Sequence, residues 1–164
     1  MVSAQDLPHH RESITIARPP EVVYAMVSDV TRMGEWSPIC TGCRWDEDQG
    51  DAPAVGAWFT GRNETPEHVW ETRCRVAVAD PGREFVFVVG ADADKVRWGY
   101  TCAVVPGGTE LTESWEILPE WVKGWADKKS GAELEEFVAE RESSARTSLS
   151  VTLAAIKMAA EAHS

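Results

Sequence analysis

Hydrophobic and polar residues alternate along much of the first 117 residues, which is the pattern of strands that bury one face. Ser13 and Thr15 alternate with Ile14 and Ile16, so a first strand is predicted over residues 12–17. The same period of two predicts six further strands, over residues 44–46, 57–63, 68–79, 85–89, 96–104 and 111–117. The short turn sequences between them, such as Pro106-Gly107-Gly108, predict an antiparallel meander.

Helical spacing interrupts this alternation in three places. Residues 21–28 carry valine and methionine at a spacing of three and four, and Asp29 is a suitable N-cap for a second short helix that ends before Trp36-Ser37-Pro38. Residues 132–162 lack proline and glycine and predict a long helix with an apolar stripe. Residues 118–131 fit a loop or a broken helical turn, and either a lid over a cavity or a fixed wall.

Composition limits the classes of function. A chain of 164 residues fits one domain, expected over 12–162 with a flexible N-terminus over 1–11. The net charge of −11 argues against a nucleic-acid partner, which requires a basic surface. The sequence shows no signal peptide and no apolar run of about 20 residues, so we expect a cytoplasmic protein without stable membrane insertion. The oligomeric state stays open, and a homodimer is one alternative.

The predicted order β-α-α-β6-α, with one long C-terminal helix, resembles the helix-grip fold of the START-like (SRPBCC) superfamily. The likeness is greatest to its polyketide cyclase/dehydrase and lipid-transport branch. It is carried by residues 16–24, by Trp36-Ser37-Pro38, and by the segments 55–59, 98–100 and 108–115 in this order and spacing. The resemblance implies an α+β fold, with a seven-stranded antiparallel sheet wrapped round the long C-terminal helix. It also implies an apolar cavity, since members of the superfamily bind lipids, sterols, plant hormones and polyketides, and a few catalyse cyclisation or dehydration.

Large aromatic residues fall on the predicted inward faces of the strands. As the lining of a pocket they would bind a flat or hydrocarbon ligand, with the Tyr100 hydroxyl available to a carbonyl group. Alternatively, they fill the interior and leave little space. Of Arg62 and Asn63, one is expected to point inward. The candidate lining residues are Trp58, Trp70, Phe85, Phe87, Trp98, Tyr100 and Trp115.

Glu113 and Arg141 are charged residues at positions where apolar ones are expected. Glu113 shares its predicted face with Leu111 and Trp115, and burial would raise its pKa so that it could serve, with Tyr100, as a general acid or base. Alternatively, it lies at the mouth of the sheet or pairs with an arginine. Arg141 falls on the stripe of the long helix, where it would bind a ligand carboxylate or phenolate, pair with Glu113, or extend to water.

The remaining motifs imply neither a metal nor a cofactor. Cys40 and Cys43 have the spacing of half a zinc site or a redox pair, but no second pair follows them, and two reduced thiols in a loop are expected. No histidine falls on a predicted inward face, which favours binding over catalysis. Three hypotheses follow: a carrier or sensor of a hydrophobic small molecule, a cyclase or dehydratase using Glu113, and an accessory protein with a largely filled cavity.

Overall fold

Seven strands form one antiparallel sheet in the order β1-β7-β6-β5-β4-β3-β2. The computed structural model of the protein describes residues 7–47 and 53–162. The strands are β1 (His9–Ile16), β2 (Cys40–Trp45), β3 (Trp58–Thr65), β4 (His68–Asp80), β5 (Glu84–Val89), β6 (Val96–Val105) and β7 (Gly108–Ile117). The helices are α1 (Pro20–Ser28), the 3-10 helix η1 (Val30–Glu35), α2 (Pro119–Ala126) and α3 (Gly131–Glu161).

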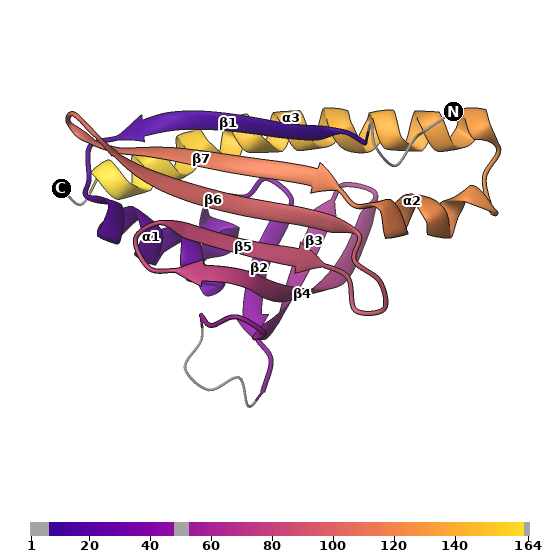
Figure 1. Cartoon of the computed structure of the whole chain (residues 1–164), viewed down its shortest axis with the longest axis horizontal. Helices are drawn as coiled ribbons and strands as arrows, with labels where there is room; N and C mark the ends of the chain where they lie inside the picture. Colours follow the sequence, from indigo (N-terminus) through magenta and orange to yellow (C-terminus); the bar gives the residue numbers. More distant parts are fainter. Residues whose placement is uncertain (1–6, 48–52, 163–164) are drawn as a thin grey trace.

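The arrangement confirms the predicted helix-grip fold. The sheet curves round α3, which runs beside β1, while α1 and η1 lie near the C-terminal end of α3 and α2 lies at its other end (Figure 1). β1 pairs with the last strand, β7, so that Ile16 lies opposite Thr109 and His9 opposite Glu116. β1 and β2 therefore form the two edges of the sheet, and α1 with η1 carries the chain from one edge to the other.

The structure changes the interpretation of three segments. β1 begins at His9, so part of the segment expected to be a flexible N-terminus is paired strand; residues 1–6 lie outside the described residues. β2 begins at Cys40, four residues before the expected start. The segment that fits either a loop or a helical turn contains α2, in which Pro119 occupies the first position, where its missing N–H has no intrahelical partner.

Side-chain caps fix the starts of two helices. The Asp29 carboxylate accepts a hydrogen bond from the Thr31 N–H at 3.1 Å, as the predicted N-cap of η1 requires. At the start of α3, the Ser130 hydroxyl accepts a hydrogen bond from the Glu133 N–H at 3.2 Å. Each cap satisfies one of the backbone donors that lack an intrahelical partner.

The space between α3 and the sheet holds two separate clusters of buried apolar side chains. One lies toward α1 and includes Ile16, Phe85 and Ile156. The other lies toward α2 and includes Ile117 and Leu134. Helix and sheet are thus held together at both ends, and the region between the clusters positions the candidate site.

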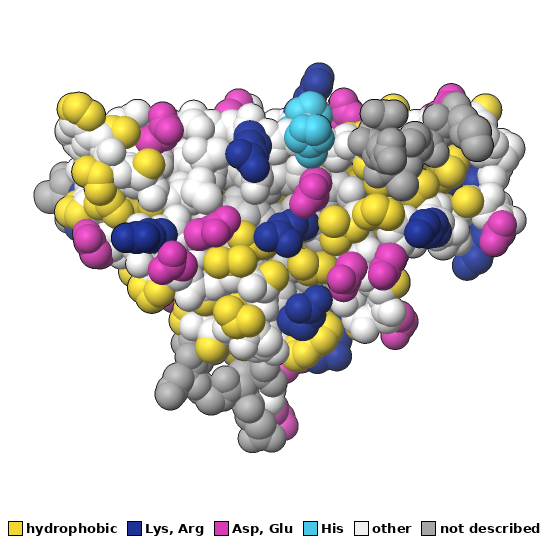
Figure 2. Space-filling view, in the orientation of Figure 1, with side chains coloured by type: hydrophobic (Ala, Val, Ile, Leu, Met, Phe, Trp, Pro, Cys, Tyr) yellow, Lys and Arg dark blue, Asp and Glu magenta, His cyan; other side chains and the backbone are white. Residues whose placement is uncertain are grey.

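Charges of both signs are interspersed on the face of the molecule shown in Figure 2. The described residues also form ion pairs between strands and loops, such as Arg97 with Glu116 at 3.8 Å and Arg75 with Asp94 at 3.5 Å. On this face the described residues form no continuous basic surface. Across 7–47 and 53–162, none of the helices has both the length and the apolar character that crossing a membrane requires.

Candidate functional site: a cavity between the sheet and the long helix

A cavity of about 220 Å³ lies between α3 and the inner face of the sheet. Members of both apolar clusters border it, including Phe87 from one and Trp115 from the other. α3 contributes Ser144, Ala145 and Ser148 to its wall. These small side chains leave space between the two apolar clusters, to which the helix contributes Leu134 and Val138 on one side and Leu153 and Ile156 on the other.

Aromatic rings form a row across the sheet side of this cavity. In the strand register, Phe87 of β5 lies opposite Trp98 of β6, and Trp98 lies opposite Trp115 of β7. Side chains directly opposite one another in adjacent strands share a face, so the three rings face the same space. Trp70 of β4 also lines the cavity. The cavity therefore has an aromatic, largely apolar wall.

Two of the expected lining residues lie elsewhere. Phe59, not Trp58, is the inward residue at the start of β3, and the Trp58 ring lies 4.5 Å below the guanidinium group of Arg73. Phe85 does point inward, but it is fully buried in the cluster near α1. The prediction that Trp58 and Phe85 line the cavity is therefore wrong. The neighbouring residue Phe59 takes the inward position expected for Trp58, and Phe85 faces inward at a point of β5 that lies beyond the cavity.

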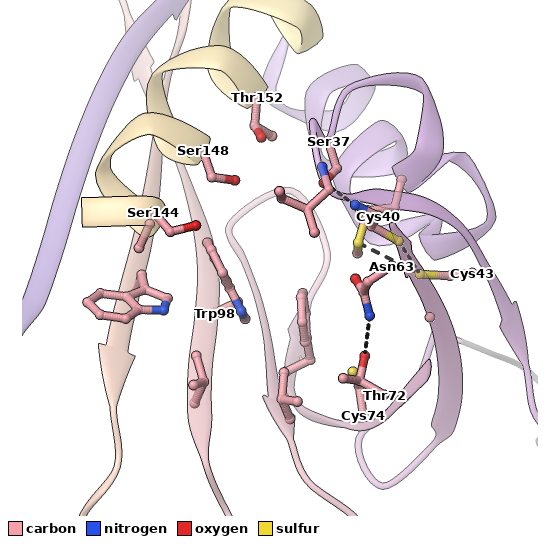
Figure 3. A pocket seen from close by; sticks show the side chains of 18 of the residues that line it. Ser37, Cys40, Cys43, Asn63, Thr72, Cys74, Trp98, Ser144, Ser148 and Thr152 are labelled. Carbon is pink, nitrogen blue, oxygen red and sulfur yellow. Dashed lines mark hydrogen bonds between the residues drawn. The ribbon is translucent and has the colours of Figure 1, made fainter. Parts of the chain in front are cut away.

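Of Arg62 and Asn63 at the end of β3, one side chain points into the cavity and the other points to solvent. Asn63 lines the cavity, where its side-chain amide donates a hydrogen bond to the Thr72 hydroxyl at 3.2 Å (Figure 3). Arg62 is exposed and donates a hydrogen bond to the Thr41 hydroxyl at 2.9 Å. This confirms the expected alternation at this point of β3.

Glu113 is a buried carboxyl group in the wall of the cavity. Its residue is 3% exposed, so it does not lie at the open mouth of the sheet. Desolvation raises the pKa of Glu113 to about 8, although a side-chain hydrogen bond with Tyr100, its partner across β6 and β7, acts to lower it. Oε1 of Glu113 has no hydrogen-bond partner among the described residues. A carboxyl with this pKa is mostly protonated at pH 7, so it can donate a hydrogen bond or a proton.

Tyr100 is held in the same buried environment. Its side chain lines the cavity and its residue is 4% exposed. Burial first, and then the neighbouring Glu113, raise the pKa of Tyr100 well above its ordinary value. The phenol is therefore neutral at physiological pH and stands next to the carboxyl group on the cavity wall.

Arg141 reaches the cavity from α3, but it does not form the anticipated pair with Glu113. The side chain is about one-third exposed (36%), and its Nη2 lies 3.4 Å from Oε1 of Glu140. Its Nε atom is buried and has no hydrogen-bond partner among the described residues. No ion pair between Arg141 and Glu113 occurs in the part of the chain that the structure describes. Both candidate polar residues thus border the cavity independently.

The thiols of Cys40 and Cys43 also line the cavity, from the opposite side to α3 (Figure 3). They belong to strand β2, so the expectation of two thiols in a loop is wrong about their location. Both are free. Within 7–47 and 53–162, no group of three or more histidine, cysteine or acidic side chains has the arrangement needed to hold a metal ion.

A comparison with known protein families agrees with the helix-grip fold. The family described as polyketide cyclase / dehydrase and lipid transport matches residues 8–147. The chain belongs to this family. No curated protein matches the chain. The family's name covers both enzymes and carriers, so it does not choose between the two hypotheses.

Solved structures with the same fold include one protein of similar sequence and others whose sequences differ widely. A Polyketide_cyc-like protein from Corynebacterium glutamicum is 46% identical, with 94% of this chain and 92% of that chain covered and a TM-score of 0.69. The Zhui aromatase/cyclase from Streptomyces sp. R1128 is 18% identical, with 94% of both chains covered and a TM-score of 0.63. The di-domain ARO/CYC StfQ of the steffimycin biosynthetic pathway is 15% identical, with 98% of this chain and 53% of that chain covered and a TM-score of 0.73. At these lower identities the likeness to Zhui and StfQ shows the fold alone.

One feature of this cavity was not predicted from the sequence: a row of hydroxyl groups on α3. Ser144, Ser148 and Thr152 recur every four residues and all line the cavity (Figure 3). Four residues of α-helix rise about 6 Å, so the three hydroxyls form a polar line along one helix face. The four-residue spacing was visible in the sequence, but serine and threonine at such positions are equally common on solvent-exposed faces.

Proposed function

We propose that the protein binds a small, flat, oxygen-bearing hydrophobic molecule in the cavity between α3 and the sheet, as a carrier or sensor. The observation that supports this proposal is that the cavity has an aromatic wall on the sheet side and a hydroxyl-bearing wall on the α3 side. Phe87, Trp98 and Trp115 contribute aromatic rings from the sheet, while Ser144 and Ser148 contribute hydroxyl groups from α3. Apolar lining with a few convergent polar groups is the usual character of a small-molecule site.

The cavity volume favours a ligand of one or two rings over a long lipid chain. A dry cavity of about 150 Å³ accommodates benzene, so the 220 Å³ found here suits a molecule somewhat larger than a single ring. The presence of this space also counts against the third hypothesis drawn from the sequence, an accessory protein with a largely filled cavity.

Two buried polar atoms support a ligand that carries hydrogen-bonding groups. Glu113 Oε1 and Arg141 Nε lack partners among the described residues, and each such atom costs about 1–3 kcal/mol when it is left unpaired. Arg141 can only donate, so it suits a carbonyl, phenolate or carboxylate oxygen. The protonated Glu113 can donate to a carbonyl or accept from a hydroxyl. A plain hydrocarbon would leave both atoms unpaired.

A second candidate function rests on Glu113 itself. A carboxyl group with a pKa of about 8, in a cavity and beside the Tyr100 phenol, has the properties of a general acid for cyclisation or dehydration of a bound aromatic precursor. In this alternative, Glu113→Gln abolishes turnover, whereas in a carrier it only modifies affinity. Turnover that survives the substitution would remove Glu113 from the mechanism.

Native mass spectrometry of the gently purified protein tests the proposal first. We expect a stoichiometric, non-covalent passenger of small mass, which denaturing extraction then releases for identification. If the protein is empty, titration with one- and two-ring phenols and ketones, followed by tryptophan fluorescence, should show saturable binding. Saturable binding of long-chain lipids and none of these compounds would contradict the proposed ligand class.

A matched pair of variants locates the binding in the cavity. Ser148→Leu places a branched apolar side chain into the cavity and should weaken binding at least tenfold without unfolding the protein. Ser143→Leu makes the same change on the exposed face of the same helix and should leave affinity unchanged. Equal affinities for both variants would place the ligand outside this cavity.

A further inference from the structure

The Cys40 and Cys43 side chains share one face of β2 because the strand contains a bulge. Residues three apart in a regular strand point to opposite faces. Here Cys40 lies opposite Asn63 and Cys43 opposite Gly61, with a register shift between Cys40 and Gly42. An advance of three residues along β2 therefore corresponds to two residues along β3. The extra residue brings both thiols to the face that lines the cavity.

The two sulfur atoms lie close enough to react with each other. Their separation is 3.4 Å, and both cysteines are free thiols (Figure 3). A disulfide bond has a length of about 2.05 Å, so rotation of the two side chains has to close a gap of little more than 1 Å. Gly61 leaves room for the pair, because a Cβ atom there would lie 3.2 Å from the Cys43 sulfur and 3.7 Å from the Cys40 sulfur.

The four thiols of the chain differ in their readiness to ionise. A hydrogen bond with Cys43 lowers the pKa of Cys40, and the same interaction, with burial, raises the pKa of Cys43. Burial raises the pKa of Cys74 to about 12 and that of Cys102 to about 11. Because the thiolate is the reactive form, Cys40 is the expected nucleophile and Cys43 the neighbour that can attack the oxidised product.

We propose that Cys40 and Cys43 are an oxidation site for small peroxides that closes to an intramolecular disulfide in the cavity wall. This goes beyond the proposed binding function and does not depend on it. Cys40 is 7% exposed and borders a cavity of about 220 Å³, so a molecule little larger than water, such as hydrogen peroxide, has the best access.

The reaction takes two steps. The Cys40 thiolate attacks one oxygen of hydrogen peroxide, the O–O bond breaks, and Cys40 becomes a sulfenic acid while the leaving hydroxide takes a proton to form water. Cys43 then loses its proton and its sulfur attacks the Cys40 sulfur, which forms the S–S bond and releases the second water. The two thiols lose two electrons and two protons in total, and the peroxide is reduced to two water molecules.

Intact-mass spectrometry of the full, reduced chain tests this proposal. After mild hydrogen peroxide treatment and alkylation with N-ethylmaleimide, two of the four cysteines should resist alkylation, with a mass loss of about 2 Da that dithiothreitol reverses. Peptide mapping of the wild-type protein should place the bond between Cys40 and Cys43. This measurement needs no variant and so does not depend on how any variant folds.

Single substitutions assign the roles. Cys43→Ser removes the second thiol, so the sulfenic acid at Cys40 should persist and be captured by dimedone, whereas Cys40→Ser should remove the reaction. Cys74→Ser is the matched control, since Cys74 lines the same cavity but should leave the disulfide unaffected. Alkylation of both Cys40 and Cys43 after peroxide treatment, or a disulfide between two chains, would overturn the proposal.

Discussion

The buried Glu113 carboxyl should make the folded state less stable as pH rises. Its pKa is about 8 in the folded protein, against 4.5 for an unperturbed glutamate, so the folded state binds the proton more tightly than the unfolded state does. Below pH 4.5 both states are protonated and the side chain imposes no penalty. Between 4.5 and 8 the free energy of unfolding falls by about 1.4 kcal/mol per pH unit, which amounts to roughly 3 kcal/mol at pH 7.

Glu113→Gln removes the titrating group and keeps the shape of the side chain. The free energy of unfolding of the variant, minus that of the wild type, should therefore rise by about 3 kcal/mol between pH 5 and pH 8 and level off above it. Urea denaturation at intervals of one pH unit measures this difference. Any constant cost of burying the amide cancels in the slope.

The control is Glu110→Gln, at an exposed position of the same strand, which leaves the buried carboxyl in place and so retains the wild-type slope. A difference between Glu113→Gln and wild type that stays constant from pH 5 to pH 8 would show that Glu113 is already ionised in the folded protein at neutral pH. That result would refute both the desolvation argument and the general-acid alternative.

Three further substitutions test the surroundings of the site, each measured by urea denaturation. Tyr100→Phe removes the hydrogen bond that lowers the pKa of Glu113, so the pH-dependent loss of stability should extend to higher pH, and this effect should vanish when Glu113→Gln is also present. Leu153→Ala opens a void in the cluster near α1 and should cost about 2–5 kcal/mol, whereas the exposed Val151→Ala on the same helix should change stability by less than about 0.5 kcal/mol. Ser130→Ala removes the cap of α3 and should cost about 0.5–2 kcal/mol; no loss would mean that the Ser130 hydrogen bond does not hold the helix start.

Much of the fold could be predicted because periodicity and turn chemistry agree along the chain. The alternation that ends at Ile117 and the uninterrupted stripe of the C-terminal helix each had one structural solution. α2 was ambiguous because Pro119 and Gly124 are compatible with both a loop and a helix, and packing decides between them: Trp121 of this helix lies against the Phe137 ring of α3, with a centroid distance of 5.3 Å.

The candidate site could be predicted only in part. Alternation shows that every second residue of a strand shares a face, but it does not show which set points inward or which of those residues border the cavity. Glu113 was found because both of its strand neighbours are large and apolar. Trp58 was misplaced, since Trp58 and Phe59 are adjacent aromatics and either could have pointed inward. The bulge in β2 lies between Cys40 and Gly42, ahead of the predicted start of this strand at residue 44, so the facing thiols of Cys40 and Cys43 emerged only from the strand register.

The polar groups of the cavity are hard to explain as products of folding alone. A core built for stability would bury leucine at position 113 and 148, and it would not retain a carboxyl group that lowers the free energy of unfolding by roughly 3 kcal/mol at pH 7. Glu113 and Arg141 each keep a buried atom without a partner among the described residues, and they do so on the border of the same space. Such departures from optimal packing concentrate at functional sites. A ligand whose oxygen substituents pair with either atom would, on binding, recover part of the stability that these side chains cost the empty protein.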